Sequence, residues 1–109
     1  MSMETRIMEA VTPIVPECVA NVYTGTAQIY CTFNMTELPE GFGNNRARAI
    51  RYLVQLHLFL PSRSDPYELK RKLRGAIIGA GFTTPAMTNA SDGDGQHYVF
   101  EFEGVDGEV

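Results

Sequence analysis

The chain has 109 residues, of which 44% are hydrophobic and 20% charged, and its formal net charge is −4 at pH 7. This length is enough for one hydrophobic core but not for two. The composition is ordinary for a globular protein and excludes wholesale disorder. A pI near 5.0 argues against a protein whose main task is to coat nucleic acid.

The charges are divided unevenly along the chain. All nine Lys and Arg lie between Arg6 and Arg74, whereas the last 35 residues contain six acids and no Lys or Arg. A small domain with opposite charge in its two parts suits a subunit that meets copies of itself head to tail.

The apolar runs are far shorter than the roughly 20 residues that span a bilayer, and the N-terminus does not resemble a signal peptide. We therefore expect no membrane partner and a cytoplasmic protein. Cys18 and Cys31 form no CxxC pattern. We expect both to be reduced and to serve as small apolar fillers.

In chain order, the first predicted element is a short helix over Met3 to Val11, because apolar residues recur there at spacings of three and four. Pro13 and Pro16 end it. A strand is predicted around Val19 to Tyr23, and a second over Gln28 to Glu37, where apolar and polar residues alternate. Its apolar side is Ile29, Cys31, Phe33 and Met35.

The segment Pro39 to Arg46 contains two Gly, two Asn and a Pro, which predicts a loop. The third strand, Ala49 to Leu60, has the clearest alternation in the chain. Its expected core face is Tyr52, Val54, Leu56, Leu58 and Leu60, and its polar face includes Arg51, Gln55 and His57. Strands of this length pair well with one another, so we expect an antiparallel pair with Gln28 to Glu37.

A second helix starts after Ser64, where Ser64 or Asp65 is expected to cap and Pro66 fits the first turn. Gly79 and Gly81 end it. The inner stripe of this helix is Leu69, Leu73, Ala76, Ile77 and Ala80.

The last part of the chain predicts a hairpin. Phe82 to Asn89 is extended, Ser91 to Gly95 turns, and Gln96 to Glu103 is the final strand. Gly104 to Val109 is predicted to fray. In the final strand Tyr98, Phe100 and Phe102 are expected to face the core, with His97, Glu101 and Glu103 opposite.

Together these elements predict one α+β domain over residues 1–109, in the order α-β-β-β-α-β-β. Its sheet is mostly antiparallel, with four to five strands, and both helices pack on one face.

No constellation of residues predicts catalysis, so we expect no enzyme, cofactor or metal. Asp92-Gly-Asp-Gly lacks the ligand spacing of an EF-hand loop and is typical of a hairpin turn. His57 and His97 fall on polar faces of strands that would be neighbours. They suit either two cross-strand surface histidines or, with Glu101, a metal or acid–base site, and the spacing favours the first.

The charged groups leave alternatives open. Lys70 to Arg74 forms a basic helix face, which suits solvent first, a subunit contact second and nucleic acid last. Glu101 and Glu103 are either solvated or matched by cations of another subunit. Arg46, Arg48 and Arg51 lie at a loop that can present cations far from the body of the protein.

Two stretches resemble small proteins of long-tailed phages and prophages. These are the strand Ala49-Ile-Arg-Tyr-Leu-Val-Gln-Leu-His-Leu-Phe-Leu-Pro and the segment from Gly81 to Glu103. The chain is similar, from about Pro16 to Val105, to the tail-terminator or tail-completion family, whose members are also called minor capsid or minor tail proteins. The resemblance rests on overall pattern, and no site is carried over residue by residue.

The resemblance implies a compact α+β subunit that forms a hexameric ring. Such a ring caps the tail tube, ends its polymerisation and joins it to the head, through edge strands, loops and complementary charge. The implied partners are copies of itself, the major tail tube protein and a head-completion or connector protein, with DNA contacted without sequence readout in the lumen. The implied locations are the bacterial cytoplasm during assembly and then the virion.

We expect the contacts to involve Gly41, Arg46, Arg48, Lys70, Arg71, Arg74, Glu101 and Glu103. The competing interpretation is a small regulatory or ligand-binding α+β domain, which the same order of elements permits. An enzyme comes third.

Overall fold

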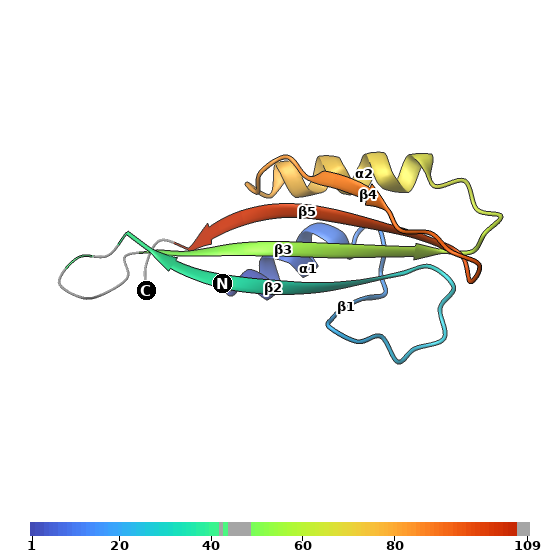
Figure 1. Cartoon of the computed structure of the whole chain (residues 1–109), viewed down its shortest axis with the longest axis horizontal. Coiled ribbons are helices and arrows are strands. Elements are labelled where there is room, and N and C mark those ends of the chain that lie inside the picture. Colours follow the sequence, from blue (N-terminus) through green and yellow to red (C-terminus); the bar gives the residue numbers. More distant parts are fainter. Residues whose placement is uncertain (42, 44–48, 107–109) are drawn as a thin grey trace.

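A computed structural model describes residues 1–41, 43 and 49–106 (Figure 1). Its elements are α1 (Met3–Val11), β1 (Cys18–Ala20), β2 (Tyr30–Glu40), β3 (Ala49–Leu60), α2 (Tyr67–Gly79), β4 (Ala86–Asn89) and β5 (Gln96–Asp106). The strands form one sheet in the order β1-β2-β3-β5-β4, in which only the β1–β2 pair is parallel. The predicted α+β class and element order are confirmed.

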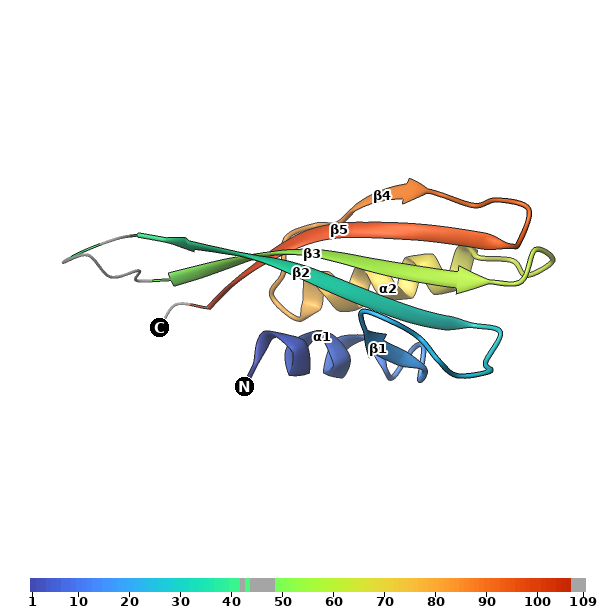
Figure 2. The ribbon, with the colours of Figure 1, turned by 60° about the horizontal axis from the view of Figure 1, so that its bottom comes forward.

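The sheet buries one face because apolar side chains recur at every second position of its three long strands. In β3, Val54 and Leu56 are buried, whereas Gln55 between them is exposed. Both helices lie on this buried side (Figures 1 and 2). The core they share with the strands includes Met3, Ile7, Val11, Cys31, Phe33, Val54, Leu56, Leu58, Leu73, Ile77, Phe100 and Phe102.

A polar side chain accepts a backbone N–H at the start of each helix. The hydroxyl oxygen of Ser2 accepts a hydrogen bond from the N–H of Thr5 at 3.1 Å and so caps α1. At the start of α2, Pro66 occupies the cap position, and the side chain of Asp65 accepts the N–H of Tyr67 at 3.0 Å. Asp65 is therefore the residue that satisfies the first N–H of the helix. Neither helix in the described part of the chain is long and apolar enough to cross a membrane.

Strand ends differ from the prediction. β1 stops at Ala20, before the predicted Tyr23, because Asn21 adopts a left-handed φ of 67° that no strand accommodates. β2 extends to Glu40 because β3 provides a partner along its whole length. The predicted fraying of residues 104–106 is wrong. They belong to β5 and pair with Ile50, Arg51 and Tyr52 of β3, whereas residues 107–109 lie outside the described residues.

The molecule is elongated, with extents of 54 × 25 × 22 Å. Figures 1 and 2 show why: the β2–β3 hairpin runs past the ends of both helices. We call residues 37–40 and 49–52 the arm. The arm places the ends of two strands beyond the core, where they are accessible to a partner.

The two cysteines lie directly opposite one another, Cys18 in β1 and Cys31 in β2, and both are free and buried. Burial raises the pKa of Cys18 to about 11, and burial together with the neighbouring Cys18 raises the pKa of Cys31. The expected role as buried apolar fillers is confirmed.

Gly104 provides a test of how tightly β5 packs on α1 and the segment after α2. A Cβ there would lie 2.7 Å from the Phe82 ring and 3.2 Å from the methyl of Met3. Phe82 is itself buried, so it has little room to move. We expect Gly104→Ala to lower the free energy of unfolding by about 1–3 kcal/mol, the usual cost of overpacking a core.

Urea unfolding monitored by circular dichroism measures this change. The matched control is Gly93→Ala in the hairpin turn, where a Cβ has open space. Equal stability of the two variants would contradict the packing described for Gly104.

Candidate functional site

One face of the sheet is turned away from the helices, and we call it the open face. No helix of the described chain covers it. Strand register arranges its side chains in five rows across β2, β3 and β5. From the arm inward the rows are Leu38–Arg51–Val105, Thr36–Leu53–Glu103, Asn34–Gln55–Glu101, Thr32–His57–Val99 and Tyr30–Phe59–His97.

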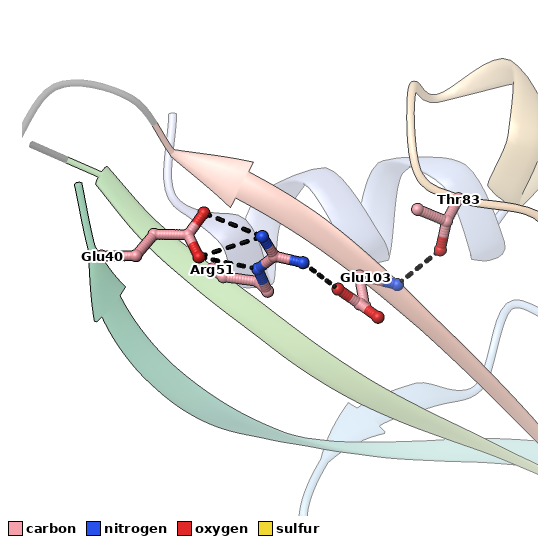
Figure 3. A network of polar contacts seen from close by, with 4 residues as sticks. All are labelled: Glu40, Arg51, Thr83 and Glu103. Atoms are coloured by element: carbon pink, nitrogen blue, oxygen red, sulfur yellow. Dashed lines mark hydrogen bonds and ion pairs between the residues drawn. The ribbon is translucent and has the colours of Figure 1, made fainter.

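At the arm end of the open face, Arg51 joins three strands (Figure 3). Its Nε donates to Glu40 Oε2 at 3.0 Å and its Nη2 donates to Oε1 at 3.1 Å, so the pair is bidentate. Its Nη1 donates to Glu103 Oε1 at 2.9 Å. These two carboxylates raise the pKa of the guanidinium, Glu40 most. Arg51 thus links both strands of the arm to β5.

Apolar side chains surround this ion network. Leu38 and Val105 flank Arg51 in the same row and are 42% and 50% exposed, and Leu53 in the next row is 38% exposed. Exposed apolar groups next to charged groups are typical of protein contact surfaces.

The middle rows form a hollow of about 630 Å³. Its floor is Leu53 and Gln55, and its wall is the segment Thr83 to Ala86. Thr83 is held there by two bonds to the backbone of Glu103, at 3.0 and 2.8 Å. Glu101 lines the hollow, is exposed, and makes no ion pair within the described residues. It is therefore available to a cation from outside.

Rings stack across the far end of the open face. The ring of Tyr30 lies 4.1 Å from that of Tyr23 and 4.7 Å from that of Phe59, and Phe59 lies 4.3 Å from His97. Because these rings stack on one another, most of their flat faces are already occupied. The column stabilises the end of the sheet and is poorly suited to stack bases.

The two histidines meet beside this column. His57 Nδ1 lies 2.8 Å from His97 Nε2, so one nitrogen donates and the other accepts. The amide nitrogen of Asn34 lies 3.4 Å from His57 Nε2. Burial first, and then the charge of His97, lower the pKa of His57, although Glu101 opposes this. The two histidines lie on neighbouring strands, as predicted, and both are half-buried. Among the residues that the structure describes, no group of three or more His, Cys, Asp or Glu side chains could hold a metal ion.

The basic face of α2 lies on the opposite layer from the open face. Lys70 sits over the ring of Tyr98, 4.5 Å from its centroid, and Arg71 is paired with Glu68 at 2.9 Å. Arg74 is exposed and lines a groove of about 340 Å³ beside Met87 of β4. These three predicted contact residues therefore lie together.

The remaining predicted contact residues do not lie with Lys70, Arg71 and Arg74 on α2. Glu101 and Glu103 lie on the open face, and Gly41 follows β2 with a left-handed φ of 68°. Arg46 and Arg48 lie outside the described residues, as does the DNA contact expected of them. Arg51 lies in β3, on the polar face predicted for that strand, but it is not a free loop cation like those with which it was grouped, because it is already paired with Glu40 and Glu103.

Comparison with known proteins gives no family for this chain. No family model matches it, and neither does any curated protein.

The two neighbouring acids of β5 should respond differently to charge reversal. Glu103→Lys places a cation against Arg51, whereas Glu101→Lys places one in an open hollow. We expect Glu103→Lys to lower the melting temperature and Glu101→Lys to leave it nearly unchanged. Differential scanning calorimetry at low and high salt measures this. The loss in Glu103→Lys should shrink at high salt, and equal melting temperatures for the two variants would contradict the network.

His57 should make stability depend on pH. The folded state holds the pKa of His57 below 6.5, so below that pH the unfolded chain binds more protons and stability falls. Between pH 7 and 5 we expect the melting temperature of the wild type to fall by a few degrees more than that of His57→Gln. Parallel pH profiles for the two proteins would show that His57 does not titrate in this way.

Proposed function

We propose that this chain is a structural subunit of the head–tail module of a long-tailed phage or prophage. In this role it forms a ring that caps the tail tube and joins it to the head. The proposal starts from the resemblance of the strand Ala49 to Pro61 and the hairpin Gly81 to Glu103 to that family. The confirmed α+β element order is the one that the resemblance implies.

The observation that carries the proposal is that two surfaces on opposite layers of the molecule, the open face and α2, differ in charge. The open face carries three carboxylates, Glu40, Glu101 and Glu103, against one cation, Arg51. Helix α2, on the other layer, carries four cations against one carboxylate, Glu68. A subunit with unlike, complementary sides makes head-to-tail contacts, and these close into a ring when the rotation between subunits permits.

The arm provides a further surface for a partner stacked on such a ring. β1 covers only Cys31 to Phe33 of β2, so within the described residues the outer edge of Asn34 to Glu40 has no strand partner. A free strand edge binds another chain readily, and Pro39 and Glu37 on this edge limit indiscriminate pairing. We assign this edge to the contact with the tube or with the connector protein.

The oligomeric state tests the proposal. We expect native mass spectrometry and negative-stain electron microscopy at high micromolar concentration to show a closed ring of six copies. A symmetric dimer would contradict the proposal. So would a persistent monomer that a small metabolite stabilises against heat, because that behaviour belongs to the competing ligand-binding domain.

A further inference from the structure

The outer surface of α2 exposes glycines that the fold itself does not require. Arg71, Gly75 and Ile78 recur at spacings of four and three and are exposed, so they share one face of the helix. Gly79 lies next to them. Within the described residues, nothing lies within 4 Å of a Cβ placed at Gly75 or at Gly79. Glycine weakens a helix relative to alanine, and here no contact within the chain compensates.

Glycine in a helix also allows another backbone or a flat surface to approach closely. Beside Gly75, Ile78 is 44% exposed, which provides an apolar contact. Lys72 is exposed and makes no ion pair within the described residues. Glu68 lies on the same face and is paired with Arg71 at 2.9 Å, so Lys72 adds a cation that has no ion-pair partner in the described part of the chain. A face with two glycines at its centre, Ile78 on one side and Lys72 on the other fits a flat partner with apolar and acidic groups.

The open face has this complementary character. It is the flat side of a sheet, it exposes Leu53, and its hollow is lined by Glu101. Since α2 and the open face lie on opposite layers of the molecule, one copy cannot bring them together. Two copies can.

We propose that the outer face of α2 packs on the open face of the next copy, with Gly75 over the hollow and Lys72 beside Glu101. This contact rests on the proposed ring and assigns its subunit interface. It is heterologous, because each copy contributes a different surface to each of its two neighbours. A partner other than a second copy would leave the oligomeric state unchanged by the substitutions described next.

Charge exchange tests the pairing of Lys72 with Glu101. We expect Lys72→Glu alone and Glu101→Lys alone each to weaken self-association about tenfold or more, because each puts like charges face to face. The chain that carries both substitutions should associate nearly as well as the wild type, since each contact then regains a Glu–Lys pair. Analytical ultracentrifugation over a concentration series measures this. Glu17→Lys, an exposed site before β1 with the same charge change, is the control.

Gly75→Gln tests the close approach without changing the charge. A Gln at this exposed helical position should raise the melting temperature by roughly 1–4 °C, because Gln favours helix more than Gly. It should also weaken self-association, because its side chain separates the two surfaces. Gly93→Gln in the hairpin turn, where the space is also open, should leave association unchanged.

The possible outcomes test the α2–open-face contact and the proposed ring independently. A ring of six that forms equally well in all the variants overturns the contact and leaves the proposed function intact. Open chains that the single reversals weaken and the double reversal restores uphold the contact and contradict the ring. A wild type that remains monomeric at millimolar concentration overturns the contact, and it contradicts the proposed function as well if a small metabolite stabilises that monomer against heat.

Discussion

The structure depends on the alternation of apolar and polar side chains in three long strands. In β2, β3 and β5, every second side chain points into a core that α1 and α2 close from one side only. A domain of this size has enough helix to cover one face of the sheet and not the other. The alternate side chains therefore lie on the open face. Because they do not belong to the core, they can contact a partner molecule.

The side chains of the open face have different roles along its length. At one end stacked rings and the His57–His97 pair stabilise the sheet, and at the other end Arg51 ties the arm to β5. Between them lies a hollow in which Glu101 has no ion-pair partner among the described residues. The two ends are thus satisfied within the chain, and the middle rows are the ones suited to receive another molecule.

Much of the fold was predictable because the alternation in residues 49–60 and the apolar stripes of both helices are local patterns. The role of Arg51 was not predictable, because it depends on the register that sets Arg51 beside Glu40 and Glu103, which are far apart in the sequence. The strand ending at Asp106 was missed for a similar reason. Gly104 is typical of a frayed end until the ring of Phe82 is seen to occupy the space beside it.

Hydroxyl-radical footprinting can show whether the open face and the outer face of α2 meet in the assembly. The measurement compares side-chain oxidation in dilute and assembled protein. We predict that Leu53 and Ile78 both lose reactivity on assembly, while Val22, 72% exposed in the loop after β1, keeps its reactivity. Assembly that leaves either Leu53 or Ile78 as reactive as in the dilute protein would contradict the proposed contact.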